Sequence, residues 1–356
     1  MNSLFSKRAL EPYVIAEIGV NHGGDLDRAK RQIRLAKLGG ASCVKFQTYK
    51  AGTLASRFSP SYWDLSEEPT ASQYELFSKY DGFGQEEYEE LARFSGTLNI
   101  DFASTPFDLA SVDFLANLVP FFKVASADLT NLPLLRKVAS KGLPVILSTG
   151  ASHLWEIASA VEILEQAGAP EVVLLHCILN YPTLFTNANL SMIESLQVAF
   201  PSMEVGYSDH TKADESLSAL EVAFSLGATV LEKHFTDNPD EGGNDHYHAM
   251  TQVQLSLFLE RCKTRLKLLG TASTKKPLLS EEVARANARR SIHAAVEIKK
   301  GELFSPDNLI CKRPGGGIDP LHWDLLIGKV SGRKIMSDEK VSMLDLVGDL
   351  AADVRQ

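Results

Sequence analysis

The sequence lacks the features that would place the protein in a membrane, in an oxidising compartment or on nucleic acid. No apolar run reaches the roughly 18 residues of a membrane-spanning helix, and the N-terminal stretch MNSLFSKRALEP has no apolar core of the kind a signal peptide carries. The four cysteines are scattered without a CxxC pair, which predicts buried free thiols. A formal charge of -9 argues against a nucleic-acid partner. Together these absences predict a soluble cytoplasmic protein.

What the sequence does have is a regular alternation of short apolar segments with longer amphipathic ones. The apolar segments are rich in Val, Ile and Leu, which is typical of parallel strands covered on both faces. Eight such strands, alternating with helices over roughly 270 residues, predict a (β/α)8 TIM barrel; an open doubly wound sheet is the alternative. The expected strands are residues 13–20, 43–48, 100–105, 121–126, 144–149, 172–177, 204–209 and 229–235.

The composition changes after Gly270. The segment TASTKKPLLSEEVARANARRS is polar and charged, and short β-like pieces between many glycines and prolines follow it. This pattern indicates a small, turn-rich second domain. The expected domains are a TIM-barrel catalytic domain at 1–275, a linker at 276–290, a β-rich domain at 291–348 and a C-terminal tail at 349–356.

Polar residues collect at the expected C-terminal ends of the strands, where the active sites of parallel barrels lie. Three pairs are spaced two residues apart and therefore share a strand face: Lys45 with Gln47, Ser208 with His210, and Glu232 with His234. The same alternation turns Lys233 away from the barrel mouth. Other polar residues at or just beyond strand ends are Glu17, Asn21, His22, Thr105, Lys123, Ser126, Ser148, Thr149 and His176.

These residue types suit a metal ion and a small anion. A single histidine at a strand end is more often structural than a ligand, but His210 and His234 end neighbouring strands and so can converge on one divalent cation. Lysines within the apolar runs VKF and FKV would neutralise an anionic substrate. The residues by themselves indicate a metal-dependent barrel enzyme that acts on an anionic small molecule. Asp25, Asp108 and Asp128 are expected to cap helices or form turns.

Nine motifs in order resemble those of the sialic acid synthase family, which includes N-acetylneuraminate synthase and bacterial legionaminic and pseudaminic acid synthases. Their number makes the resemblance specific, and it covers about residues 11 to 346. The motifs are AEIGVNHGG (16–24), VKFQT (44–48), STPFD (104–108), ILSTGA (146–151), LLHC with NYP (174–177 and 180–182), GYSDHT (206–211), LEKHFT (231–236), GNDH (243–246) and KRPGGGI (312–318).

The resemblance implies a TIM barrel followed by an antifreeze-protein-like SAF domain, in a domain-swapped homodimer. It implies that phosphoenolpyruvate condenses with an open-chain N-acetylated hexosamine, such as N-acetylmannosamine, and that phosphate is released. It also implies a divalent cofactor, Mn2+ by preference with Mg2+ or Co2+ as alternatives.

The resemblance assigns roles to individual residues. Catalytic positions match Glu17 and Glu232, and the metal ligands match His210 and His234. Phosphoenolpyruvate contacts match Lys45, Thr105, Lys123, Ser126, Ser148 and Ser208. Sugar-side positions match Gln47, Tyr181, Asp245 and Arg313, and the arginine is expected to reach the site from the partner subunit.

The sequence departs from the family pattern at three places. It has KVASAD where many members have KIGSGE, so that Asp128 is one methylene shorter than the usual acid. It has HCILNYP in place of HCTNxYP, so Leu179 replaces an asparagine and Asn180 follows one step later, on the other face of an extended chain. GNDHYHAM differs from the frequent GPDH followed by small residues. These departures bear on the sugar more than on the reaction class.

Two alternatives remain at this stage: another metal-dependent barrel aldolase or isomerase, and a non-catalytic sugar-binding relative. The long connection at residues 49–84 is expected to be functional or to pack over the barrel rim, because long loops in compact domains seldom lack a role. Its aromatic residues favour an ordered segment over a disordered one.

Overall fold

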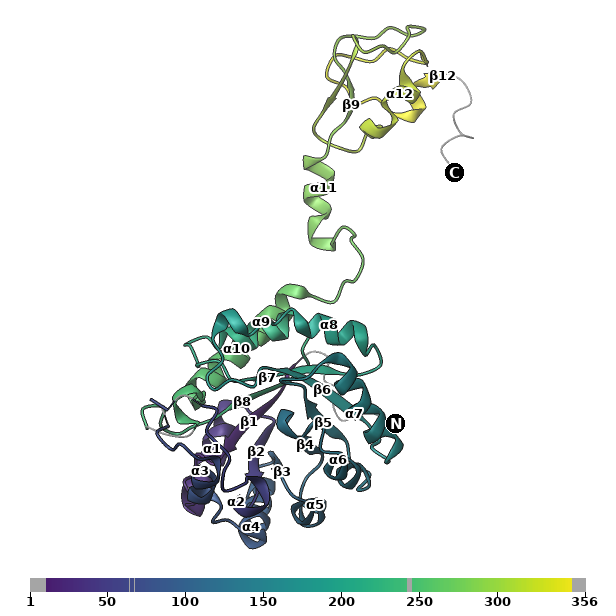
Figure 1. Ribbon diagram of the computed structural model, residues 1–356. Coiled ribbons are helices and arrows are strands. Elements are labelled where there is room, and N and C mark those ends of the chain that lie inside the picture. Colours follow the sequence, from purple (N-terminus) through teal and green to yellow (C-terminus); the bar gives the residue numbers. More distant parts are fainter. Residues whose placement is uncertain (1–10, 64, 67, 242–244, 348–356) are drawn as a thin grey trace. The chain divides into compact units, whose positions relative to one another are not determined.

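The computed structural model describes residues 11–63, 65–66, 68–241 and 245–347. The chain divides into two compact units, one ending at Gly270 and the other beginning at Thr271 (Figure 1). The predicted linker at 276–290 contains helix α11 (Glu282–Ala288), which belongs to the second unit. The predicted tail, 349–356, lies outside the described residues.

The first unit is a nearly closed barrel of eight parallel strands, which confirms the predicted fold class. Hydrogen-bonded neighbours run in the order β3-β2-β1-β8-β7-β6-β5-β4, and β3 and β4 lie in contact with each other. The strands are β1 (Tyr13–Gly19), β2 (Cys43–Thr48), β3 (Asp101–Pro106), β4 (Phe122–Val124), β5 (Val145–Ser148), β6 (Val172–Cys177), β7 (Val205–Asp209) and β8 (Val230–His234).

Helices follow the strands and lie on the outside of the barrel (Figure 1). Asp25 caps the first by accepting bonds from the backbone N–H groups of Asp27 and Arg28, and Asp108 caps α5 in the same way through Ser111, as predicted. The helices are α1 (Leu26–Gly39), α4 (Gln85–Thr97), α5 (Leu109–Leu115), α6 (Leu132–Ala139), α7 (Leu154–Gln166), α8 (Met192–Ala199), α9 (Ser218–Ser225) and α10 (Gln252–Leu269).

The inside of the barrel changes from apolar to polar along each strand. In β1, Tyr13 and Ile15 belong to a buried cluster that fills the barrel, and Glu17 stands two residues further on. In β8, Val230 belongs to the same cluster, and Glu232 follows on the same face. Because side chains alternate between faces, the apolar residues close one end of the barrel and polar residues line the other.

The connection between β2 and β3 is more structured than the sequence suggested. It contains two short helices, α2 (Ala51–Leu54) and α3 (Gln73–Tyr80), and a bridge between Pro60 and Ser72. Ser72 caps α3 by accepting a bond from the Glu75 backbone N–H. The segment therefore contains two short helices that the sequence analysis did not predict.

The second unit is small and turn-rich. It contains the antiparallel pairs β9 (Ser291–Ala294) with β10 (Leu309–Lys312) and β11 (Val330–Ser331) with β12 (Leu346–Val347), and the short helix α12 (Trp323–Leu326). Its own apolar core consists of Ile292, Ala294, Ile298, Phe304, Leu309, Ile318, Leu326, Ile335 and Val341. Within the described parts of the chain, no helix is both long enough and apolar enough to cross a lipid bilayer.

Candidate active site

A cavity of about 390 Å³ lies at the C-terminal ends of the barrel strands. Every site residue predicted in the barrel lines it. Arg313 belongs to the second unit, where its side chain is exposed. The predicted residues found in the cavity wall are Glu17, Lys45, Gln47, Thr105, Lys123, Ser126, Ser148, Tyr181, Ser208, His210, Glu232, His234 and Asp245.

One part of the cavity, here called the lysine side, consists of Glu17, Lys45, Lys123 and Glu232. Lys45 Nζ lies 2.5 Å from Glu17 Oε2 and 3.8 Å from Glu232 Oε2, and Lys123 Nζ lies 3.4 Å from Glu232 Oε1. Glu17 and Lys45 meet because they are register partners in β1 and β2. All four side chains are almost completely buried, so each charge depends on its partners for stabilisation.

Hydroxyl and amide groups complete the lysine side. Lys45 Nζ donates to Thr105 Oγ1 at 3.1 Å, and Lys123 Nζ donates to Ser148 Oγ at 2.7 Å. Ser208, the register partner of Glu232, donates to Glu232 Oε1 at 2.8 Å. Gln47 donates to Glu17 Oε1 at 3.0 Å. The lysine ammonium groups are thereby held close together in a dry environment, which suits the binding of a multiply charged anion.

The two glutamates differ in acidity. Burial raises the pKa of Glu17 to about 7, although Lys45 opposes the shift. Burial acts in the same direction on Glu232, but Lys123 and Lys45 outweigh it and lower the pKa of Glu232 to about 2. Glu232 therefore stays ionised and neutralises the lysines, whereas Glu17 can gain or lose a proton near neutral pH.

The other part of the cavity, here called the histidine side, is lined by His210, His234 and Asp245, and the buried His248 packs against His234 with 4.8 Å between ring centroids. The ring centroids of His210 and His234 are 5.5 Å apart, as expected for residues that end neighbouring strands. His210 Nδ1 lies 3.0 Å from the backbone oxygen of Ile178. A proton on Nδ1 would serve that bond and leave Nε2 with a free lone pair, the usual arrangement of a metal-ligating histidine.

The residues of the histidine side fit a divalent cation. Donor atoms of His234, Asp245 and His248 all lie within 4.8 Å of one another. Three buried imidazole nitrogens of this group, Nδ1 of His234 and both nitrogens of His248, have no hydrogen-bond partner among the described residues. Burial and the neighbouring histidines hold the pKa of His234 and of His248 well below the usual value, so both rings are neutral and able to bind a cation.

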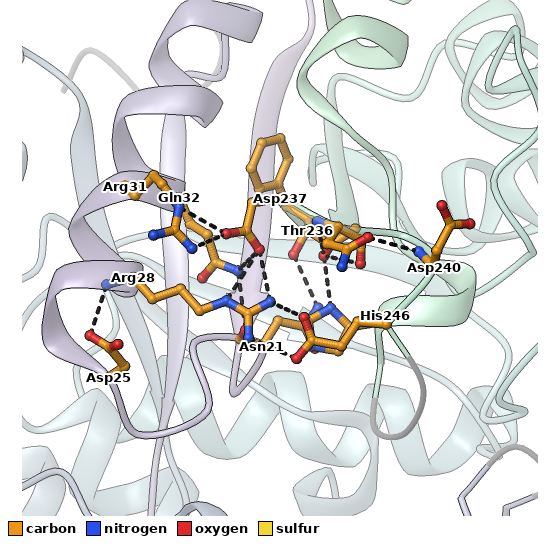
Figure 2. Close-up of polar contacts among 12 residues, drawn as sticks. Asn21, Asp25, Arg28, Arg31, Gln32, Thr236, Asp237, Asp240 and His246 are labelled. Carbon is orange, nitrogen blue, oxygen red and sulfur yellow. Dashed lines mark hydrogen bonds and ion pairs between the residues drawn. The ribbon is translucent and has the colours of Figure 1, made fainter.

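The loop after β8 is fastened to helix α1 by a polar network (Figure 2). Arg28 lies 2.9 Å from Asp237 and 2.5 Å from Glu241, and Arg31 lies 2.6 Å from Asp237. The Arg28 and Arg31 guanidinium groups and the Gln32 amide outweigh the effect of burial and lower the pKa of Asp237 to about 2. This anchor fixes the start of the loop that carries Asp245 and His248.

The end of the same loop pairs with β8. Met250 N–H donates to the His234 backbone oxygen at 2.7 Å, and Thr236 N–H donates to the Met250 oxygen at 3.0 Å. His246, between the two ends, approaches Thr236 Oγ1 at 2.7 Å through its Nδ1 atom. Both ends of the loop are therefore fixed, which places Asp245 and His248 beside His234.

Aromatic residues and the β2–β3 connection form the rim. Tyr181 packs on His210 with 4.2 Å between ring centroids and contacts Tyr62 at 6.2 Å. Tyr62 and Trp63 belong to the 49–84 connection, and both line the cavity. Leu179 also lines the cavity, while the Asn180 side chain is exposed. Leu179, at the position where the resemblance implied an asparagine, therefore forms part of the cavity wall.

Some polar residues near strand ends have structural roles. Asn21 donates to the Phe235 oxygen, His22 stacks on Phe83, and His176 bonds the Ala188 oxygen. Lys233 points away from the cavity, as its place in the alternation predicted, and pairs with Asp209 at 2.7 Å.

The sequence analysis assigned no role to Cys177 or His248. It expected Asp128 as a cap or turn residue, at a position where the family pattern has a longer acid. Cys177 lines the cavity with its Sγ 3.7 Å from His210 Nδ1. Asp128 also lines it, while accepting a bond from Asn131. The sequence marked the position of His248 as unusual, because GNDHYHAM departs there from the motif of the family that the sequence resembles. It did not predict where the His248 side chain points, since that depends on the fold of the loop.

Comparison with known proteins gives concordant matches. The NeuB family model matches residues 32–274, and the SAF domain model matches residues 289–347. The N,N'-diacetyllegionaminic acid synthase of Campylobacter jejuni is 38% identical over 92% of this chain and 98% of its own length. The human N-acetylneuraminate-9-phosphate synthase is 33% identical over 84% of this chain and 82% of its own.

A solved structure agrees with these relatives. The N-acetylneuraminic acid synthetase from Leptospira borgpetersenii serovar Hardjo-bovis, crystallised with citrate, superposes with a TM-score of 0.67 at 33% identity. The match covers 78% of this chain and 90% of that one.

Proposed function

We propose that this chain, which belongs to the NeuB family, is a synthase that condenses phosphoenolpyruvate with an open-chain N-acetylated hexosamine such as N-acetylmannosamine. The products would be a nine-carbon sialic-acid-type sugar and phosphate. The observation that carries the proposal is that one cavity joins two buried lysines, Lys45 and Lys123, with two buried histidines, His210 and His234. The names of the relatives, which are synthases of legionaminic and neuraminic acids, support the same conclusion.

Phosphoenolpyruvate would bind on the lysine side. Lys45 and Lys123 would neutralise its phosphate and carboxylate groups, and hydroxyls would donate the remaining hydrogen bonds. The proposed hydroxyl donors are Thr105, Ser126, Ser148 and Ser208.

The reaction consumes one water molecule. C3 of phosphoenolpyruvate forms a bond to the aldehyde carbon, and the hydroxyl of the water adds at C2. The tetrahedral intermediate then breaks its C2–O bond to phosphate. One water proton ends on the former aldehyde oxygen, and the other leaves with the phosphate. Glu17 would take the first proton from the attacking water, while Glu232, ionised throughout, keeps both lysines charged and in position.

The sugar would bind on the histidine side, with its aldehyde near His210 and His234. A divalent cation held by these two histidines, Mn2+ by preference and Mg2+ or Co2+ as alternatives, would supply Lewis-acid polarisation of the aldehyde. Gln47, Tyr181 and Asp245 would position the sugar chain. Leu179 presents an apolar surface to the cavity, so we expect an acceptor different from that of relatives with asparagine there.

Arg313 would complete the sugar site from the partner subunit of a domain-swapped homodimer. Two inactive variants, Arg313→Ala and His234→Ala, should then complement each other when co-refolded, because a mixed dimer contains one intact site. Random mixing predicts recovery to about a quarter of wild-type activity. A verified heterodimer without activity would contradict the swapped arrangement and leave Arg313 as an ordinary surface residue.

The reaction itself is tested by phosphate release from phosphoenolpyruvate across a panel of acetamido sugars. Release that requires both an acetamido hexose and a divalent cation supports the proposal, and His234→Ala serves as the inactive control. Sugar conversion without phosphoenolpyruvate would favour a metal-dependent aldolase or isomerase. Sugar binding without any turnover would favour a non-catalytic relative.

A further inference from the structure

His248 is a buried histidine to which none of the described residues offers a hydrogen bond. It ends a short 3-10 turn, His246–His248, and its side chain is 0% exposed. Neither of its ring nitrogens has a hydrogen-bond partner among the described residues. Burying a polar ring without partners costs free energy that a purely structural position would avoid with an apolar residue.

The ring of His248 packs beside His234 and His210 of the histidine side. Its centroid lies 4.8 Å from that of His234 and 6.3 Å from that of His210, and its Nε2 atom lies 3.9 Å from Asp245 Oδ1. His234 Nδ1, itself without a hydrogen bond, lies 3.5 Å from Asp245 Oδ2. The unsatisfied nitrogens of His234 and His248 are therefore gathered around one carboxylate.

His246, two residues away in the same turn, has polar partners for both of its ring nitrogens. Its Nδ1 atom bonds Thr236 Oγ1 at 2.7 Å, and its Nε2 atom lies 3.7 Å from Glu241 Oε1. Glu241 in turn pairs with Arg28 of α1, so His246 is part of the polar network that fastens the loop (Figure 2). One histidine of the turn is thus used to hold the loop, and the other is left with both nitrogens available.

We propose that His248 is a third imidazole ligand of the divalent cation, in addition to His210 and His234 and with the carboxylate of Asp245. The inference deepens the proposed function, on which it rests for the presence of a cation. Ligands of one such ion lie about 2.0–2.2 Å from it and hence roughly 3–4 Å from one another, so small side-chain rotations would bring these donor atoms, now within 4.8 Å, into place.

A third imidazole changes which cation the site prefers. Mg2+ favours oxygen ligands, whereas imidazole nitrogen suits the later transition metals. A site built from nitrogen and one carboxylate should therefore bind Co2+ more tightly than Mg2+. Loss of His248 should weaken Co2+ binding while leaving the weaker Mg2+ binding nearly unchanged.

The first experiment measures cation binding without any substrate. Chelator-treated full-length protein is titrated with Co2+ and with Mg2+ by calorimetry, in the wild type, in His248→Ala and in His246→Asn. The asparagine control keeps a polar group at the position of Nδ1. We expect the Co2+ dissociation constant of His248→Ala to rise at least about tenfold, with little change in His246→Asn. An unchanged constant in folded His248→Ala overturns the proposal.

Two further measurements do not depend on a loss of binding. In His248→Cys, a ligating thiolate should give a sulfur-to-Co2+ charge-transfer absorption that the wild type lacks, and its absence from the folded, Co2+-loaded variant counts against the proposal. Pulsed EPR of the Mn2+-loaded wild type, labelled with 15N in histidine, should detect three coordinated imidazoles. A count of two overturns the proposal even if no variant folds.

These results separate the inference from the proposed function. Two coordinated imidazoles together with sugar-dependent phosphate release would remove His248 from the metal site and leave the synthase proposal intact. Three imidazoles without phosphate release would support the ligand set and reject the reaction.

Discussion

The lysine side and the histidine side share one cavity but differ in how far the protein satisfies its own polar groups. On the lysine side, two ammonium groups lie among two carboxylates and several hydroxyls at 2.5 to 3.8 Å. On the histidine side, three imidazole nitrogens are buried without a hydrogen bond among the described residues. Glu17 Oε2 and Glu232 Oε2 also lack a hydrogen bond among the described residues, but each is ion-paired with Lys45. Opposite charges therefore balance the lysine side, and they do not balance the neutral imidazoles of the histidine side.

The difference indicates how each side would act. A charge network that balances itself can hold its shape before the substrate arrives, and it binds an anion by exchanging one partner for another. Neutral imidazoles around one carboxylate have no such internal balance, and a cation would satisfy them all at once. Substitutions should therefore have different consequences on the two sides.

The largest expected effect is on the histidine side. His234→Ala should reduce turnover by at least about a thousandfold, because the Lewis acid that activates the aldehyde would no longer be held. Bound metal, measured by elemental analysis after dialysis, should fall in parallel. His176→Asn is the matched control, since His176 is buried at another strand end but bonds the Ala188 oxygen. Full activity of metal-free wild type would refute this part of the comparison.

The next effect concerns the proton transfer assigned to the lysine side. Glu17→Gln should lower the rate by about 10²–10⁴-fold. In the wild type, a base with a pKa of about 7 is active when deprotonated, so kcat/KM should rise as the pH increases through about 7. The variant should lose this rise. Asp128→Asn, which alters another carboxylate of the cavity, should keep it; a pH rise that persists in Glu17→Gln would assign the base elsewhere.

Replacement of the two lysines should have similar effects on substrate binding but different effects on stability. Both Lys45→Met and Lys123→Met should weaken phosphoenolpyruvate binding by about 1–3 kcal/mol. Lys45→Met also removes the close partner of Glu17, and breaking a buried ion pair costs about 3–5 kcal/mol of stability. In Lys123→Met, Glu232 keeps Lys45 and Ser208, so its loss of stability should be smaller. Substrate titrations measure the loss of binding, and denaturant unfolding measures the loss of stability. Equal stability losses in the two variants would contradict the inference that Glu232 has other partners after Lys123 is removed.

The smallest expected effect lies outside the cavity, at the loop anchor. Asp237→Asn should lower stability by about 1–2 kcal/mol near neutral pH, a figure reduced from the full pKa shift because Arg31 is partly exposed to solvent. Since the folded pKa of about 2 is below the ordinary 3.8, the stabilisation is present above about pH 4 and is lost as the pH falls toward 2. Unfolding curves at several pH values measure it.

A control in the same loop sharpens this test. Asp240→Asn changes an exposed aspartate that makes no ion pair in the described structure, and it should leave stability nearly unchanged. If the anchor positions the histidine side, Asp237→Asn should also weaken Co2+ binding. An effect on stability alone would limit Asp237 to a structural role.

Much of the site on the barrel strands could be predicted from the sequence. Lys45 with Gln47 and Glu232 with His234 lie on strands, where side chains alternate strictly, so a spacing of two residues places both on the same face. All four line the cavity. The apolar residues that precede them, such as Val230 before Glu232, also showed which end of each strand would be polar.

Other features required the tertiary structure. His248 and Asp245 follow β8 in a loop without a fixed period, and their positions depend on Arg28 and Asp237, which are far apart in sequence. The connection at 49–84 looked like a loop because its two helices are short, and short helices depend on packing rather than on local propensity.

The sequence by itself determined the barrel, the small second domain and the set of strand residues at the cavity, because hydrophobic periodicity and strand alternation are local properties. Only the tertiary structure decided which buried groups find partners. Whether a nitrogen of His246 or of His248 is satisfied depends on what a distant segment places within hydrogen-bonding distance. Hydrogen bonds act over about 3 Å, so sequence spacing alone does not specify them where the chain leaves regular secondary structure.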